Sequence, residues 1–225
     1  MIDKLSKWVV VLSKVRRFHK SEVLMSIKDI RRNYIIDIAI KLFFKESMAD
    51  IKIKDIANKA GIGEATFYRY FPNRTSLIAA CATFFQDEVG RKYFLFENKG
   101  NGFDKLKLFY YRFYEIFKAH QEYYKFLSEF DAYCTRIDRK WLTQYSEQME
   151  FFRDSYISIY NEGVADGSVR EVEDINGFYF ATTHALLSLC KKFAFEGNII
   201  KQDELINKEA EVKTIADICL YALKK

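Results

Sequence analysis

Residues 53–77 read IKDIANKAGIGEATFYRYFPNRTSL, and their spacing decides how the rest of the chain is interpreted. The first eight carry apolar side chains at three- and four-residue intervals, which indicates a helix with one buried face. Gly61 ends that helix, because glycine adopts a positive φ without Cβ strain. Gly63 can cap a second helix, which Pro72 brings to an end. The stretch therefore predicts a helix, a tight turn and a second helix.

The second helix is too short to form a core element by itself. Phe67 and Phe71 lie four residues apart and can pin it to its neighbours. Its hydroxyl and guanidinium groups then point elsewhere, and such groups reach phosphate oxygens and base edges when a helix enters the major groove of DNA. Asn73 is a strong N-cap for the next helix, and Arg74 in its first turn makes sense if an anion docks there.

The short motifs in this stretch resemble those of the TetR family of bacterial transcriptional regulators. They are Asp55-Ile56-Ala57, Ala60-Gly61-Ile62-Gly63, Thr66-Phe67-Tyr68-Arg69-Tyr70-Phe71 and Arg74. The sequence departs from the family pattern where a serine is usual (Gly63), where a basic or small residue is common (Glu64) and where a threonine caps the first helix (Lys52). The alternative is a helical hairpin with no role in nucleic-acid binding.

The resemblance implies an all-α fold with a three-helix DNA-binding head and a six-helix body for ligand binding and dimerisation. We expect an N-terminal extension over 1–27, the head over 28–88 with its motif at about 52–71, and the body over 89–225. The predicted DNA-binding residues are Arg31, Arg32, Lys54, Gly63, Glu64, Ala65, Thr66, Tyr68, Arg69, Tyr70 and Arg74.

Composition and charge favour the same organisation. Nine glycines and one proline in 225 residues are too few for an all-β chain with many turns. Residues 1–80 carry 16 Lys and Arg against 8 Asp and Glu, a net charge of +8, whereas the remainder carries 20 against 23, a net charge of −3. The basic part contains the helix-turn-helix, as expected if it approaches a polyanion; a solvated basic surface is the alternative.

The cysteines and histidines do not indicate a catalytic or metal site. The four cysteines never form a C-x-x-C pair and indicate buried thiols in a reducing, cytoplasmic compartment. The three histidines lack metal-ligand spacing, and His184 in an apolar helix is typical of a hydrogen-bonded core histidine. No nucleophile-base pair or phosphate loop is visible, so we expect no catalytic residues, no metal and no cofactor.

The first 24 residues contain an uninterrupted apolar run of only five residues, from Trp8 to Leu12. That run is too short for a membrane span or a secretion signal. An amphipathic stripe leaves open a membrane-surface helix or an arm laid along DNA, but we favour a poorly packed extension. Met25 is an alternative start of the chain.

The expected body is rich in aromatic residues, which number 26 between residues 81 and 180. Core packing is the default role of each, but aromatic rings also line apolar pockets and tyrosine hydroxyls can orient a ligand. The resemblance implies that some face a cavity for an effector. The candidates are Tyr110, Phe113, Tyr114, Phe117, Trp141, Tyr145, Phe152, Tyr156 and His184.

The last two expected helices, about 174–195 and 203–223, carry more apolar surface than one packed face needs. Two such helices from each of two chains would form a four-helix dimer interface, as the family does. We therefore predict a dimeric repressor that a small apolar or aromatic effector releases from a double-stranded DNA operator. The alternatives are a helical adaptor, or an enzyme that uses the aromatic cavity without binding DNA.

Overall fold

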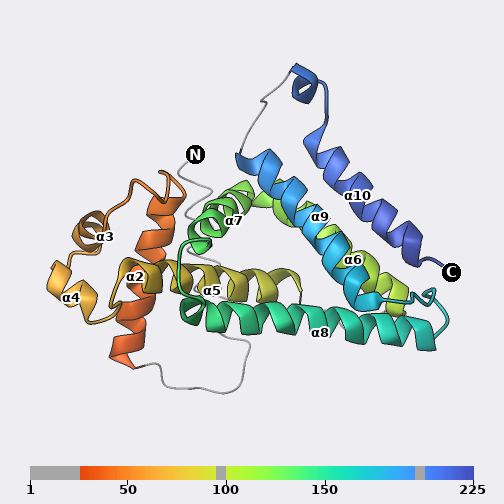
Figure 1. The fold of residues 1–225 in the computed structure, drawn as a ribbon, viewed down its shortest axis with the longest axis horizontal. Helices are drawn as coiled ribbons and strands as arrows, with labels where there is room; N and C mark the ends of the chain where they lie inside the picture. Colours follow the sequence, from red (N-terminus) through yellow and green to blue (C-terminus); the bar gives the residue numbers. More distant parts are fainter. Residues whose placement is uncertain (1–25, 95–99, 196–200) are drawn as a thin grey trace. The chain divides into compact units, whose positions relative to one another are not determined.

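The computed structural model describes residues 26–94, 100–195 and 201–225, apart from the side chains of 202 and 203. Over these ranges the chain is helical and contains no strand, which confirms the all-α prediction (Figure 1). The α-helices are α2 (Ile27–Phe43), α3 (Ile53–Lys59), α4 (Glu64–Tyr68), α5 (Arg74–Tyr93), α6 (Gly102–Ala119), α7 (Gln121–Cys134), α8 (Thr143–Ala165), α9 (Ile175–Phe195) and α10 (Lys208–Leu223). Two 3-10 helices cover Arg139–Leu142 and Lys201–Glu204.

Backbone contacts separate Met1–Tyr34 from Ile35–Lys225. The extension expected over 1–27 lies almost wholly outside the described residues. In the first unit, Ser26 caps the start of α2, because its Oγ accepts a hydrogen bond from the Asp29 backbone N–H at 3.1 Å. The remainder of α2 and all later helices belong to the second unit.

The caps of α3 and α5 explain why both helices begin where the sequence indicates. Lys52 supplies no capping side chain, as expected, but its backbone N–H donates to the Asp55 carboxylate at 2.8 Å. Asn73 caps α5 through its side-chain oxygen, which accepts from the Ser76 N–H at 2.8 Å. These caps satisfy N–H groups that have no partner inside their own helix.

The later helices pack as a bundle in which α6 lies against α8 and α10, and α7 lies against α9. Helix α5 runs beside α8, as Figure 1 shows. The core between α6, α8 and α9 is aromatic: the Phe109 and Tyr156 ring centroids are 4.9 Å apart, and Tyr156 and Tyr179 are 5.1 Å apart. The apolar spacing predicts this helix order, with boundaries that differ by a few residues.

The structure bears on two further predictions. None of the four cysteines forms a disulfide; Cys81, Cys190 and Cys219 are buried, as expected, whereas Cys134 is half-buried. Among the described residues, no helix is long and apolar enough to cross a membrane.

Candidate nucleic-acid interface and body cavity

The turn between α3 and α4 depends on glycine. Gly61 has a φ of 69°, in the left-handed region that other residues adopt only with strain. This conformation closes the end of α3, where the Gly61 N–H donates to the Asn58 carbonyl and the Ile62 N–H to the Ala57 carbonyl. Gly63 then caps α4 with extended backbone, as its position in the sequence predicts. Helix, turn and helix are therefore formed as expected, although α4 ends at Tyr68 rather than near Phe71.

Helix α4 is held by two buried rings. Phe67 and Phe71 are almost fully buried, with ring centroids 5.6 Å apart. The side chains of Glu64, Ala65, Tyr68 and Arg69 are exposed, whereas those of Thr66 and Tyr70 are half-buried. The short helix thus presents hydroxyl, guanidinium and carboxylate groups to solvent, and its apolar residues fix its orientation.

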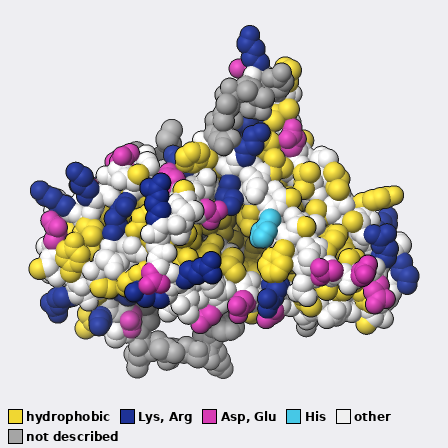
Figure 2. Space-filling view, viewed as in Figure 1, with side chains coloured by type: hydrophobic (Ala, Val, Ile, Leu, Met, Phe, Trp, Pro, Cys, Tyr) yellow, Lys and Arg dark blue, Asp and Glu magenta, His cyan; other side chains and the backbone are white. Residues whose placement is uncertain are grey.

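Basic side chains surround this exposed face. Lys54 and Lys59 on α3 are exposed, as is Arg69 just after α4. Figure 2 shows Lys and Arg side chains gathered over the end of the molecule that contains α3 and α4. Arg31 is also exposed and Arg32 is half-buried, both on the first turns of α2 in the other unit. The basic surface of α3 and α4 suits the phosphate backbone of DNA.

Arg74 lies where the sequence places it, at the start of α5, but its guanidinium is used inside the protein. It donates to the Met48 carbonyl and lies 5.7 Å from the centre of the Tyr133 ring of α7. Next to it, the Thr75 hydroxyl is 2.8 Å from the Tyr133 hydroxyl. Arg74 therefore links α5 both to α7 and to the turn that precedes α3. The resemblance implied a contact with DNA.

The comparisons with known proteins agree with this geometry. A sequence model of the TetR family, described as bacterial regulatory proteins, matches residues 35–81, which include α3, α4 and the start of α5. The chain belongs to the TetR family. It is accordingly a DNA-binding regulator of transcription, and the alternatives of an adaptor or an enzyme are not favoured.

Three relatives illustrate how far the TetR-family likeness extends. The HTH-type transcriptional repressor KstR2 of Rhodococcus jostii (strain RHA1) is 27% identical over 148 residues, which cover 64% of this chain and 71% of that protein. The structure of the ketosteroid transcriptional regulator KstR2 of Mycobacterium tuberculosis matches with a TM-score of 0.59 and 16% identity, covering 87% of this chain and 95% of that one. The fatty acid degradation regulator FadR from Bacillus halodurans matches with a TM-score of 0.61 and 15% identity, covering 84% and 94%. At these identities the two structures show the shared fold alone.

The aromatic residues predicted to face an effector in the body lie in several environments. Tyr110, Phe113, Phe117 and Tyr156 are buried in the core. The Tyr110 hydroxyl bonds to those of Tyr156 and Thr182, each at 2.9 Å. Burial raises the pKa of both Tyr110 and Tyr156 well above the ordinary value, so both hydroxyls stay protonated. These two tyrosines are satisfied within the core.

Four of the other five candidates are less buried, and Phe152 is buried. Tyr114, Trp141 and Tyr145 are half-buried, and the ring of Tyr145 packs against Phe130 at 5.1 Å between centroids. His184 is exposed on α9, 5.7 Å from the Phe180 ring, so the expectation of a core histidine is wrong for the single chain. Phe152 alone among the nine candidates lines the cavity between α5 and α8.

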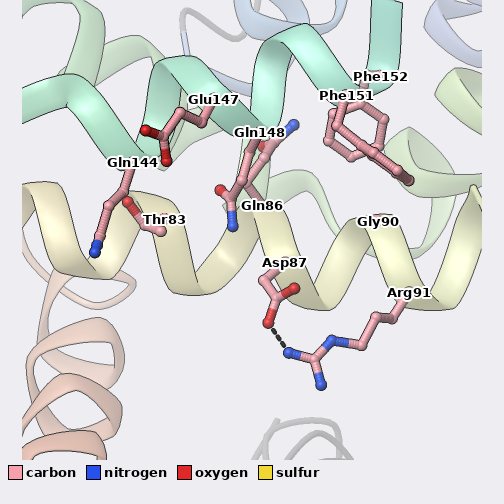
Figure 3. Close-up of a pocket in the computed structure, with 10 residues that line it drawn as sticks. All are labelled: Thr83, Gln86, Asp87, Gly90, Arg91, Gln144, Glu147, Gln148, Phe151 and Phe152. Atoms are coloured by element: carbon pink, nitrogen blue, oxygen red, sulfur yellow. Dashed lines mark ion pairs between the residues drawn. The ribbon is translucent and has the colours of Figure 1, made fainter. Parts of the chain in front are cut away.

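That cavity has a volume of about 530 Å³ and a largely polar set of lining residues (Figure 3). They are Thr83, Gln86, Asp87, Gly90 and Arg91 from α5, and Gln144, Glu147, Gln148, Phe151 and Phe152 from α8. Both sets repeat at intervals of three and one, which is the spacing of one helical face. This spacing of polar residues is visible in the sequence, but a polar helical face ordinarily indicates contact with solvent and not a cavity. Among the described residues, no group of side chains could hold a metal ion.

Proposed function

We propose that this TetR-family regulator is a dimeric repressor, released from its operator when a small molecule binds in the body. The observation that carries the proposal is the exposed polar face of α4 on a helix-turn-helix held by Phe67 and Phe71. The description of the Rhodococcus jostii relative as a repressor supports the direction of regulation.

The residues proposed to contact DNA are those that the structure leaves on or near this face. Arg69 and Lys54 supply charges for the phosphate backbone, and Tyr68, which is 46% exposed, supplies a hydroxyl and a ring. Gly63 and Glu64 begin the helix, where base edges are read in helix-turn-helix complexes. Glu64 accepts hydrogen bonds only and therefore favours cytosine N4 as a partner.

A second copy of this chain is proposed to cover the apolar surface of α9 and α10. Phe180 and Phe195 on α9 are 43% and 50% exposed, and Ile218 and Tyr221 on α10 are 59% and 82% exposed. Large side chains at such exposure on adjacent helices mark an interaction surface. A two-fold dimer would present two α4 helices to successive major grooves.

The effector site is proposed to be the cavity between α5 and α8. Helix α5 begins directly after its N-cap Asn73, which follows the helix-turn-helix, so a ligand against α5 can favour one position of the head over another. The lining rings of Phe151 and Phe152 support the expected apolar or aromatic part of the effector. The names of two relatives, a ketosteroid regulator and a fatty acid degradation regulator, are compatible with a largely apolar compound.

The test is a gel shift with the DNA upstream of the protein's own gene, at several salt concentrations. We expect binding that weakens steeply with salt. Replacing Arg69 by glutamine should lower the slope of log affinity against log salt by about 0.9 for each phosphate that the side chain neutralises. Arg139→Gln, at an exposed arginine of the body, is the matched control and should leave the slope unchanged. Failure to bind at low salt, or equal slopes for wild type and Arg69→Gln, would contradict the proposed interface.

A further inference from the structure

The cavity between α5 and α8 has an apolar end and a polar remainder. Figure 3 shows Phe151 and Phe152 together near Gly90, whereas Gln144 and Thr83 lie at the opposite end. A volume of about 530 Å³ accommodates a compound of ordinary metabolite or drug size. The chemistry of the lining then decides which compounds fit.

The apolar end is shaped by a glycine. A Cβ atom on Gly90 would lie 2.9 Å from Cζ of Phe152, so only glycine lets this ring lie directly against the α5 backbone. The neighbouring Phe151 is 61% exposed. The two rings meet edge to face, with centroids 6.2 Å apart, and the exposed ring of Phe151 offers a face on which a flat apolar group can pack.

The middle of the cavity contains an amide with an unsatisfied acceptor. Oε1 of Gln86 accepts from the Tyr123 hydroxyl at 2.7 Å, so this oxygen is already paired. Oε1 of Gln148 is buried and has no hydrogen-bond partner among the described residues. A buried amide oxygen without a partner is unfavourable, and a ligand that donates an N–H or O–H here would remove that penalty.

The charges of the lining favour a cationic or neutral ligand over an anionic one. Asp87 and Arg91 form an ion pair with each other, drawn in Figure 3. Glu147 also lines the cavity and forms no ion pair with any described residue. The net charge of the lining is therefore negative, which attracts a cation and repels a carboxylate.

We propose that the effector has a flat apolar body and a hydrogen-bond-donating head that is neutral or cationic. Its body packs on the exposed ring of Phe151 beside Phe152, its donor bonds to Gln148, and Glu147 selects against a carboxylate. This inference rests on the proposed effector role of the cavity and narrows the chemical class that the cavity accepts.

Three naphthalene compounds of matched shape test the class by isothermal titration of the full-length protein. They are 2-naphthylmethylamine, which is cationic, 2-naphthamide, which is neutral and donates hydrogen bonds, and 2-naphthoate, which is anionic. We expect the amine and the amide to bind, with 2-naphthoate roughly tenfold weaker because of repulsion by the lining. Equal affinity for 2-naphthoate, or no binding of any compound, would overturn the proposal.

Variants then assign the interaction to named residues. Glu147→Gln removes one partly exposed charge, so it should lower the affinity for the amine by roughly threefold or more. The affinity for the amide should be nearly unchanged. Glu150→Gln is the matched control, because Glu150 is an exposed carboxylate of the same helix outside the lining. Gln148→Leu removes the hydrogen-bond acceptor and should lower the affinity for both the amine and the amide by roughly fivefold. Equal effects of Glu147→Gln and Glu150→Gln would contradict a role for the cavity.

The same protein preparations are also tested for DNA binding by gel shift. If DNA binds but the compounds show the wrong charge preference, the proposed ligand class fails and the regulator function stands. If DNA does not bind, the proposed function fails whatever the compounds do.

Discussion

At the scale of single residues, Arg74 shows how a familiar position can take a different role. Its sequence neighbours, Asn73 and Pro72, place it at the start of α5, where a cation is unfavourable to the helix dipole unless something compensates it. In this protein the Met48 carbonyl and the Tyr133 ring surround the guanidinium. We therefore expect Arg74 to hold α5 against the turn at Met48 and against α7, rather than to neutralise a phosphate.

Salt dependence of DNA binding separates these two roles. Arg74→Gln should weaken DNA binding because the turn at Met48 loses its anchor, but leave the slope of log affinity against log salt unchanged. Arg69→Gln should lower that slope by about 0.9 per neutralised phosphate. The measurement is fluorescence anisotropy of labelled duplex DNA from about 50 to 200 mM salt, a range over which such contacts are resolved. If Arg74→Gln also lowered the slope of log affinity against log salt, Arg74 would contact a DNA phosphate after all.

The two glycines of the turn give a second prediction at this scale. Gly61→Ala places a side chain at a φ of 69° and should lower the free energy of unfolding by about 1–2 kcal/mol. Gly63→Ser is the control, because its backbone is extended, with a φ of −75°, a Cβ atom there meets nothing within 4 Å, and serine is itself a favoured N-cap. Urea denaturation measures both variants. Equal destabilisation would show that the conformation of Gly61 is not what the turn requires.

At the scale of elements, α7 contacts both the wall of the cavity and the turn that precedes the helix-turn-helix. Its Tyr123 bonds to Gln86 in the wall of the cavity. Roughly two to three turns further along, Glu129 accepts a hydrogen bond from the Met48 N–H, and Tyr133 meets Thr75 at the start of α5. A ligand that changes the Gln86 contact therefore acts on a helix that also holds the turn before the reading elements.

Removing the Glu129 contact should loosen that turn without touching either the cavity or α4. Glu129→Ala leaves the Met48 N–H without its acceptor, which costs roughly 1–3 kcal/mol for a buried donor. Hydrogen exchange of the segment around Met48 should become faster, and DNA affinity should fall with an unchanged salt slope. Ser128→Ala on the preceding residue is the control. Unchanged exchange near Met48 would mean that α7 does not hold the turn.

At the scale of the whole molecule, the apolar residues of α9 and α10 determine the proposed assembly. Ile218→Glu places a charge on a surface that is proposed to be buried between two chains, so we expect a monomer by light scattering and much weaker operator binding. Leu108→Glu changes a 39% exposed leucine of α6, outside the proposed interface, and should leave a dimer. A dimeric Ile218→Glu protein would contradict this interface.

Much of the fold could be predicted from the sequence because its signals are local. Gly61, Gly63 and Asn73 specify a turn and two helix starts through backbone geometry, and the structure has each as predicted. The apolar spacing likewise predicts the helix order. The sequence places the end of α4 a few residues late: the helix ends at Tyr68, although the Phe71 N–H still donates to the Phe67 carbonyl at 3.1 Å.

The burial and the partners of individual side chains in the body could not be predicted as well, because they depend on contacts between residues far apart in the sequence. Tyr110 and Tyr156 are 46 positions apart, and nothing local shows that they satisfy each other. Gln86 and Gln148 line one cavity only because α5 packs against α8. His184 lies in an apolar helix but on a face that the single chain leaves open. Aromatic content indicated a core, whereas the lining of the cavity shows in the sequence only as polar helical faces, which ordinarily indicate contact with solvent.

The short length of α4 has a consequence for how this regulator can evolve. Phe67 and Phe71 hold the helix, so its exposed positions, Glu64, Ala65, Tyr68 and Arg69, contribute little to folding. If α4 reads DNA as proposed, we expect substitutions there to change which bases are preferred while the protein remains folded. A duplicated gene could therefore acquire a new set of target promoters through a few exposed changes, with its effector response intact.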